Sequence, residues 1–486
     1  MSQFNKEIKE SFLNLERNAS DIIDSFNDDS GLNMWPAVRQ CYMYDFKIGQ
    51  TSRYIENNLT NNSFFHKEKL ATSPPLLRGL TRIKKGACLL IGLPKLYTLQ
   101  TQNGKYDPYL DPIADIASEI GLSPLKIIHG TFPEKTDTYN PTIEIPHQVS
   151  EQELINVNQL QQPESYQDYA NLCLQHKHPA LHLTNIWKTH YTIQSHYELY
   201  LKYLETIEPC MVILICYYCP LNLGIALACD KLNIPCIDYQ HGIQSHPHLG
   251  YNFGYMPPSG YKTIPKWFFT WGESYQKNLE NEFAAQTYHQ SLIGGKPTHI
   301  AWHKGTLPED DNLVARFNEK IQGKEVICVC LPLLGDKKIL KELEKAISES
   351  PKNWIWLMRK HPLLTTEEYI PWFIDDYPEK IEHDICSRIS IELVLTHSKH
   401  IVTELSTCPQ EALSSFGVKC TLISQIASEI YYKEEVQQGV FRIAKTKDEI
   451  LNNINVSLRE KRIPTETHTT SNPEYLKKAL KKVLSY

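Results

Sequence analysis

Several common sequence features are missing from this chain of 486 residues. No GxGxxG follows a first strand, which argues against a dinucleotide-dependent dehydrogenase, and the absence of GxxxxGK[ST] excludes a P-loop NTPase. The longest apolar run, MVILICYY at 211–218, is far shorter than the roughly 20 residues that a membrane span needs. The chain also lacks a basic surplus, because its formal net charge is −6, so we expect no nucleic-acid partner.

A disulfide framework and a secretory signal are missing as well. The 13 cysteines show no regular, even spacing, and the first residues, MSQFNKEIKESFLNLERN, are polar with helical periodicity. We therefore expect reduced thiols and a cytoplasmic protein.

The length and the strand pattern predict two α/β domains. A chain this long exceeds one ordinary core, and short apolar strands alternate with amphipathic helices in two separate stretches, as in parallel sheets covered by helices. We predict a helical N-terminal extension (1–80), a first domain (81–297), a second domain (298–465) and a C-terminal amphipathic helix (466–486).

A Gly/Pro-rich stretch, LIGGKPTHIAWHKG, separates the two predicted domains and is typical of a hinge. Gly294 and Gly295 lie in it. They serve either to let the backbone approach a nucleotide or simply to make the turn.

The predicted strand in WIWLMRKHP ends in cationic and titratable side chains. Pro362 biases His361 toward an extended conformation, and Arg359 and Lys360 add positive charge on opposite faces of the strand. Ligands of open parallel sheets bind beyond the carboxyl ends of the strands. Two interpretations are open at this point: an anion site, or a strand stopped by proline with solvated basic residues.

A second strand, HIVTELST, runs directly into the predicted helix CPQEALSSF. Thr407-x-x-Gln410 fits a capping box, and the free N–H groups of such a helix start favour an anion. Thr407 is then either only a cap or a phosphate ligand, and Ser406 is the freer hydroxyl. His361 together with Ser406 and Thr407 suits one phosphate group.

His361-Pro362 and Ser406-Thr407, in that order within a carboxyl-terminal α/β domain, resemble the HP and Ser-Ser/Thr motifs of bacterial GT-B glycosyltransferases that use CMP-sugars. These families include sialyltransferases, polysialyltransferases and capsule Kdo transferases, and related arrangements occur in CDP-glycerol glycerophosphotransferases. The resemblance implies two Rossmann-like domains facing a central cleft. It also implies that His361, Ser406 and Thr407 hold the cytidylyl phosphate, while the first domain binds the acceptor and supplies a base.

We expect the general base in the stretch CIDYQHGIQSHPHLGYNFGY, where a strand ends in Asp238, Gln240 and His241. His241 is the leading candidate, since a neutral imidazole accepts a hydroxyl proton near pH 7. Asp238 either orients it or acts itself, although strand alternation puts the two on opposite faces. The glycerophosphotransferases place their base in a His-Gly pair, whereas the sialyltransferases use an acidic residue. Gln240 and His246 are expected to line the acceptor site.

No metal or other cofactor is predicted. The histidines of this stretch lack the HExxH or cysteine pattern of a zinc site, and no strand ends convincingly in Asp-x-Asp. Fixed hydrogen-bond donors at the leaving phosphate would replace a metal, each worth about 3 kcal/mol. In the polar loop LQTQNGKYDPYLDP, Asn103 and Asp107 are candidate acceptor ligands, with turn formation as the alternative.

Together these features predict an α/β, GT-B, inverting and metal-independent glycosyltransferase. It would move a sugar acid of the sialic, pseudaminic or Kdo type from a CMP-sugar to a bacterial surface glycan or lipid-linked glycan. Two alternatives remain open: a CDP-alditol polyol-phosphate transferase, and a non-catalytic glycan- or nucleotide-binding subunit. The terminal helix, with leucines on one face and lysines around it, either packs across both domains, which we favour, or contacts the inner membrane peripherally.

Overall fold

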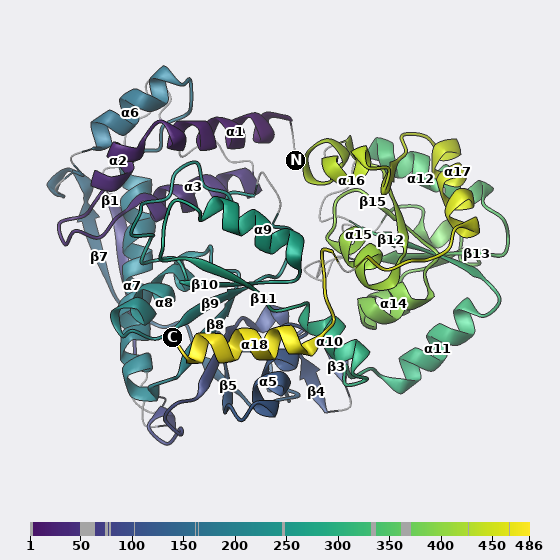
Figure 1. Ribbon diagram of the computed structural model, residues 1–486, viewed down its shortest axis with the longest axis horizontal. Coiled ribbons are helices and arrows are strands. Elements are labelled where there is room, and N and C mark those ends of the chain that lie inside the picture. Colours follow the sequence, from purple (N-terminus) through teal and green to yellow (C-terminus); the bar gives the residue numbers. More distant parts are fainter. Residues whose placement is uncertain are drawn as a thin grey trace.

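Two parallel β-sheets, each covered by helices, form the framework of the protein (Figure 1). The structure is a computed structural model. It describes residues 3–48, 64–72, 76, 79–101, 103–160, 162–163, 165–244, 248–331, 337–360, 371–425, 427–465 and 467–486.

The first sheet has seven strands in the order β11-β10-β9-β8-β2-β5-β6, all paired in parallel. Its strands are β2 (Cys88–Gly92), β5 (Pro124–His129), β6 (Thr142–Ile145), β8 (Met211–Ile215), β9 (Cys236–Tyr239), β10 (Trp267–Thr270) and β11 (Gln290–Ile293). Its helices are α5 (Leu110–Glu119), α6 (Tyr166–Gln175), α7 (Leu183–Ile207), α8 (Pro220–Lys231) and α9 (Glu273–Glu282). Side chains of β2 alternate between two hydrophobic clusters on opposite faces, so the sheet is buried on both sides.

The second sheet has six parallel strands in the order β14-β13-β12-β15-β16-β17. Its strands are β12 (Glu325–Cys330), β13 (Trp354–Arg359), β14 (Ile381–Glu382), β15 (His400–Thr403), β16 (Lys419–Leu422) and β17 (Phe441–Ile443). Its helices are α11 (Asp311–Ile321), α12 (Lys337–Glu349), α13 (Ile385–Arg388), α14 (Ile391–His397), α15 (Cys408–Glu411), α16 (Lys433–Gln437) and α17 (Lys447–Arg459), with π-helical turns at Ala412–Phe416 and Ala427–Tyr431. Two Rossmann-like α/β domains are therefore present, which confirms the predicted fold class.

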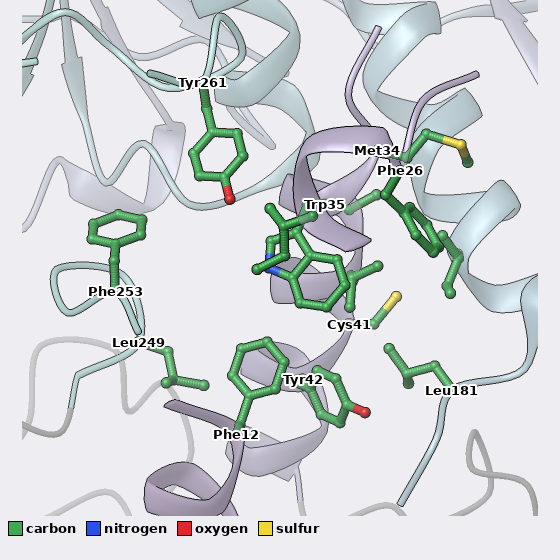
Figure 2. Close-up of a cluster of buried hydrophobic side chains, with 14 of the residues drawn as sticks. Phe12, Phe26, Met34, Trp35, Cys41, Tyr42, Leu181, Leu249, Phe253 and Tyr261 are labelled. Atoms are coloured by element: carbon green, nitrogen blue, oxygen red, sulfur yellow. The ribbon is translucent and has the colours of Figure 1, made fainter. Parts of the chain in front are cut away.

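The N-terminal helices α1 (Gln3–Arg17), α2 (Ser20–Ser25) and α3 (Trp35–Ile48) pack onto the first domain around Trp35 (Figure 2). Arg39 is buried there, pairs with Glu16, and donates to the carbonyl oxygens of Leu249 and Asn252. These contacts tie the extension to the segment that follows β9.

One part of the extension differs from the prediction of helices and loops. Residues Phe64–Leu70 form strand β1, which pairs antiparallel with β7 (Val149–Asn156) and lies against α7. The strand depends on a partner far along the chain, so local periodicity did not reveal it.

The chain returns to the first domain at its end, as helix α18 (Pro473–Leu484). The apolar face of α18 is buried in the same cluster as strands β2, β8 and β10, through Leu476, Ala479, Leu480 and Val483. The helix therefore packs, as we favoured, but its apolar face lies on the first domain rather than across both domains. The helices of the described ranges include none with the length and hydropathy of a membrane span.

The hinge glycines lie between β11 and α10 (Pro297–His303), at the predicted domain boundary. Their carbonyl oxygens both accept from the Tyr239 hydroxyl, at 2.9 and 2.8 Å. A Cβ on Gly294 would lie 2.8 Å from that hydroxyl oxygen, and Gly295 has φ of 78°. Close packing and a left-handed turn therefore account for both glycines.

Candidate functional site

The carboxyl edge of the first sheet carries the predicted base. Asp238 lies in β9 with its carboxylate fully buried, accepting from the Tyr217 backbone N–H at 2.8 Å and from the Tyr251 hydroxyl at 3.0 Å. Burial raises the pKa of Asp238 to about 7, although these two hydrogen bonds oppose the shift. Asp238 therefore holds the turn after the neighbouring strand β8.

His241 follows β9 and lies against that same turn. Its Nε2 is 2.9 Å from the hydroxyl oxygen of Tyr218, which follows β8. Its backbone oxygen accepts from the Tyr109 hydroxyl at 3.2 Å. Tyr109 precedes α5, so chain segments after β2, β8 and β9 meet at His241.

The other predicted acceptor residues have structural partners. Gln240 is buried and uses both ends of its amide, accepting from the Trp271 N–H and donating to the Gly242 carbonyl. Asp107 is buried at the start of α5, where Oδ1 accepts from two backbone N–H groups and burial raises its pKa to about 7. The Gln240 side chain thus bonds the backbone around His241, and the Asp107 carboxylate accepts from the backbone at the start of α5.

Asn103 lies in a different place, at the exposed turn between β3 (Leu99–Thr101) and β4 (Gly104–Tyr106). This hairpin replaces the expected irregular loop. Asn103 borders an open hollow of about 850 Å³ between the hairpin and residues 133–137. His246 lies outside the described residues.

The second sheet presents Ser406 and Thr407 where its strand order reverses. Strands β13 and β14 extend the sheet on one side of β12, while β15, β16 and β17 extend it on the other. The segment after β15 therefore leaves the sheet at the topological switch point, where open α/β sheets bind ligands.

The predicted capping box at this point is wrong. Thr407 makes no side-chain cap, and the Cys408 N–H donates instead to Ser406 Oγ at 3.2 Å. Gln410, the other half of the predicted box, accepts from Tyr275 and donates to Glu435. The Gln410 amide oxygen therefore bonds a first-domain residue, Tyr275, and the side chain does not return to the backbone at the start of the helix.

The strand end of β13 is tied to helix α13. Arg359 donates to the carbonyl oxygens of Cys386 and Ile389, and the Lys360 N–H donates to Ser387 Oγ at 3.1 Å. The guanidinium thus supports the neighbouring helix. His361 and Pro362 lie outside the described residues.

The two carboxyl edges meet at the domain boundary. Ile243, two residues after His241, packs against the hydrophobic core cluster of the second domain, against which Leu405 and Cys408 also pack. Burial, and then the Glu411 carboxylate, raises the pKa of Tyr109. The turn with His241 and the segment with Ser406 and Thr407 therefore line one interdomain region.

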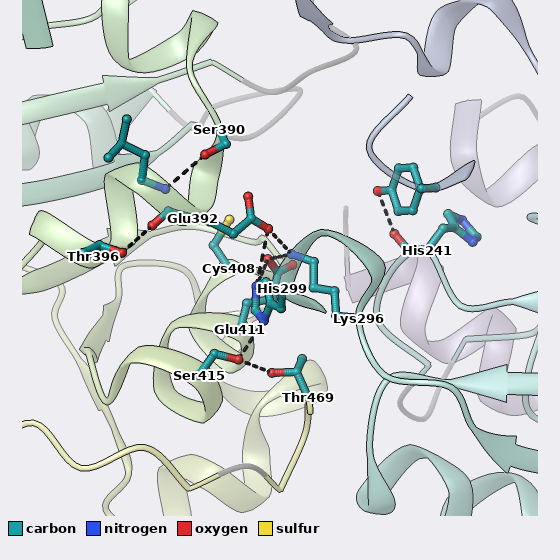
Figure 3. A network of polar contacts seen from close by, with 12 residues as sticks. His241, Lys296, His299, Ser390, Glu392, Thr396, Cys408, Glu411, Ser415 and Thr469 are labelled. Atoms are coloured by element: carbon teal, nitrogen blue, oxygen red, sulfur yellow. Dashed lines mark hydrogen bonds and ion pairs between the residues drawn. The ribbon is translucent and has the colours of Figure 1, made fainter. Parts of the chain in front are cut away.

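A buried charged network crosses that boundary (Figure 3). Lys296, just before α10, pairs with Glu411 of α15 and lies 3.7 Å from Glu392 of α14. The side chains of the three residues are 7%, 4% and 1% exposed. Burial opposes the charge on Lys296, but the two carboxylates prevail and raise its pKa.

His299 extends this network on the next turn. Its Nδ1 is 2.7 Å from Ser415 Oγ, which in turn is 2.9 Å from Thr469 Oγ1. Burial, together with Lys296, lowers the pKa of His299 well below its ordinary value. The ring is therefore neutral, so its 3.6 Å approach to Glu392 is not an ion pair.

Several of these residues were not predicted. Tyr218 stands in the strand-like run CYY, and Lys296 stands in the Gly/Pro-rich hinge. Strand-terminal position could have indicated Tyr218, because it follows a buried parallel strand just as His241 does. Nothing in the local sequence indicates that Lys296 is buried.

No protein-family model and no curated protein sequence matches the chain. Among solved structures, the UDP-GlcNAc 2-epimerase from Methanocaldococcus jannaschii is 14% identical with a TM-score of 0.51, covering 83% of this chain and 100% of its own. The Neisseria meningitidis enzyme, bound to UDP-GlcNAc, is 10% identical with a TM-score of 0.51, over 82% and 100%. The fold is GT-B. A calicheamicin glycosyltransferase is also similar, at 12% identity and a TM-score of 0.45 over 83% and 99%. At these identities the likeness concerns the fold alone.

Proposed function

We propose that this GT-B protein is a metal-independent, inverting glycosyltransferase that moves a sugar acid from a CMP-sugar to a glycan acceptor. One observation carries the proposal. His241 just beyond β9 and Ser406–Thr407 at the switch point of the second sheet border the same interdomain region, with Ile243 packed against the second-domain core cluster that Leu405 and Cys408 also contact. A base on one side and phosphate ligands on the other are what direct displacement requires.

In this mechanism the acceptor hydroxyl gives its proton to His241 while its oxygen bonds to the anomeric carbon of the donor. The bond from that carbon to the phosphate oxygen breaks, and its electron pair leaves with CMP. Ser406, Thr407 and His361 would donate hydrogen bonds to the phosphate as its charge grows, which lowers the barrier most when the donors are already fixed.

The comparisons support a nucleotide-sugar donor in general terms. Two neighbours with the same fold are UDP-GlcNAc 2-epimerases, one of them bound to UDP-GlcNAc. The cytidine base is supported by the resemblance of the His361-Pro362 and Ser406-Thr407 motifs alone. The nucleotide is therefore the first property to measure.

Calorimetric titration with CMP, CDP, UMP, UDP and UDP-GlcNAc tests the donor. We expect CMP to bind most tightly, and we expect both Ser406→Ala and His361→Ala to weaken CMP at least about 10-fold, since a charge-assisted hydrogen bond contributes about 1.5–3 kcal/mol. The matched control is Ser424→Ala. Ser424 follows the adjacent strand β16, and its hydroxyl lies 3.5 Å from the Ala427 N–H much as Ser406 caps Cys408, but it lies one strand away from the switch point.

The outcomes separate the candidates. Uridine preference, or CMP binding that neither variant changes, would contradict a cytidylyl site at Ser406. Nucleotide binding without transfer or hydrolysis of any CMP-sugar would favour a non-catalytic binding subunit. Metal independence is checked separately, since turnover should be unchanged in the presence of a chelator.

A second candidate is transfer of a polyol phosphate from a CDP-alditol. The observation in its favour is the pair His241-Gly242 shortly after β9, because the resembling glycerophosphotransferases carry their base in such a pair. There the bond broken lies at phosphorus, and the donor has two phosphates. CDP binding tighter than CMP, with CMP as the released product, would favour this alternative.

A further inference from the structure

The outward face of α18, on the surface of the first domain, is cationic (Figure 1). The four buried side chains of this helix lie on its inner face. Since successive residues of a helix are about 100° apart, Lys478, Lys481 and Lys482 lie on the opposite side, and all three are exposed. Within the described part of the chain, the ion pairs of α18 are those of Lys477 with two glutamates. The three outward lysines therefore carry uncompensated charge.

Two further lysines continue this surface past the end of α18. The Lys266 Nζ lies 3.9 Å from the centre of the Tyr486 ring and 5.4 Å from that of the Tyr288 ring. The Lys262 Nζ lies 3.6 Å from the same Tyr288 ring and 4.0 Å from the Asp230 carboxylate, which offsets its charge. These contacts join the loop before β10 to the end of α18. We call the five residues the lysine surface: Lys262, Lys266, Lys478, Lys481 and Lys482.

Aromatic and aliphatic side chains are exposed at the same place. Tyr475, Leu484 and Tyr486 are 44%, 40% and 72% exposed. They are three of the eleven large hydrophobic side chains exposed among the described residues, although they fall within twelve consecutive positions. The Tyr486 ring meets Trp267 edge-on, with centroids 5.5 Å apart. Tyrosine joins an apolar ring to a polar hydroxyl and is enriched where membrane and water meet.

The fold alone does not explain this clustering. Like charges four positions apart, as at Lys478 and Lys482, destabilise a helix. The helix dipole favours Lys481 and Lys482 in the last turn, but it favours neither Lys478 nor the exposed apolar side chains beside them. The whole chain has a formal net charge of −6, so the lysine surface departs from the average. Lysines interspersed with exposed aromatic and aliphatic groups complement an anionic lipid surface.

We propose that the lysine surface docks the first domain reversibly on a membrane that contains anionic lipids. The lysines lie at the head groups, and Leu484 and Tyr486 reach the boundary between head groups and acyl chains. The four lysines without an ion pair give on the order of 10³-fold enrichment, at about 1 kcal/mol each. This inference goes beyond the proposed function, since docking needs no nucleotide. Under that function, docking brings the protein to a lipid-linked acceptor.

Sedimentation with vesicles tests the proposal on the full chain and without any substrate. We expect binding to vesicles of phosphatidylcholine with about one third phosphatidylglycerol, and none to vesicles of phosphatidylcholine alone. Raising the salt from about 0.1 M to about 1 M shortens the Debye length from about 10 Å to about 3 Å, so most of the bound protein should be released.

Variants separate the charged from the apolar contribution. Lys478→Gln/Lys481→Gln/Lys482→Gln should lower the partition coefficient on the order of 100-fold, because three contributions of about 1 kcal/mol are removed and about 1.4 kcal/mol is tenfold. All three side chains are exposed, so the variant keeps its core. Leu484→Ser/Tyr486→Ser should weaken binding by a factor that salt does not change, since burial of apolar groups is not screened.

The matched control removes the same number of lysines from another helix. Lys337→Gln/Lys341→Gln/Lys345→Gln changes three exposed lysines of α12, on the second domain. Charges beyond the Debye length from the docked face are screened, so this variant should stay within about twofold of the wild type.

The outcomes decide for or against docking. No binding to the anionic vesicles, equal binding to both kinds of vesicle, or equal losses in the two lysine variants would overturn it. Binding to dextran sulfate, a soluble polyanion, with none to vesicles would also overturn it, because the surface would then bind an acidic polymer. Vesicle binding by a protein that binds no CMP would support docking and contradict the proposed donor alone. Transfer from a CMP-sugar without vesicle binding would contradict docking alone.

Discussion

The buried pair of Lys296 with Glu411 offers the sharpest test of how the domains are held together. Replacing Lys296 with methionine keeps the length of the side chain but leaves Glu411 and Glu392 without their shared cation. Burial is the main cause that lowers the pKa of the neighbouring His299 and Lys296 is the second, so the burial that opposes a charge on this ring remains in the variant. Removing one partner of a buried pair typically costs about 3–5 kcal/mol, since the remaining charge stays desolvated. We expect a loss of unfolding free energy in that range.

Urea unfolding followed by tryptophan fluorescence measures this loss. The Trp271 ring lies 5.2 Å from Lys296 Nζ and reports on the boundary directly. Circular dichroism recorded on the same samples should give the same midpoint if a single free energy applies. The double variant Lys296→Met/Glu411→Gln should recover part of the loss, with a coupling energy of about 1–3 kcal/mol.

Lys304→Met is the matched control. Lys304 caps the same helix, α10, and pairs with Glu119 across a contact whose side chains are 27% and 36% exposed. An exposed ion pair is worth about 0–1 kcal/mol, so this variant should remain close to the wild type. Equal losses for the two lysine variants, or a double variant that simply adds the single effects, would refute the buried-charge argument.

Two further predictions concern stability. Because burial raises the pKa of Asp238 from 3.8 to about 7, the folded protein should lose stability as the pH rises from about 4 to about 7, by on the order of 4 kcal/mol at 1.36 kcal/mol per pKa unit. Thermal unfolding across that range should be less pH-dependent in Asp238→Asn, and an identical pH profile would contradict the assignment. In α18, Leu480→Ala should cost about 2–5 kcal/mol because the side chain is fully buried, whereas Leu484→Ala, at 40% exposed, should cost little in the same assay. Equal effects of the two leucine variants would mean that α18 does not close the core.

The strands of both sheets could be predicted because parallel sheets bury both faces. Met211–Ile215 and Trp354–Arg359 therefore appear as continuous apolar runs. His241 was found because it lies two residues beyond the end of a predicted strand, β9. Strand β1 was missed for the opposite reason. Its residues alternate weakly, and its partner β7 comes about 80 positions later.

The contacts that organise the site could not be predicted from local sequence. Lys296 stands in a hinge, and its burial depends on two glutamates from the other domain. The capping box expected at Thr407 fails because Gln410 bonds Tyr275 instead, again across the boundary. Spacing rules describe one helix or strand at a time, whereas these interactions exist only after two domains have come together.

The return of α18 to the first domain has a consequence for synthesis of the chain. Strand β11 ends at Ile293, and α18, which covers part of the same core, begins only at Pro473. At about 5–20 residues per second, a ribosome needs on the order of 10–40 seconds to produce the intervening second domain. During that time the apolar side chains beneath α18 remain uncovered, so the nascent first domain presents a surface that molecular chaperones recognise. The core of the first domain is therefore completed only after the second domain has been synthesised.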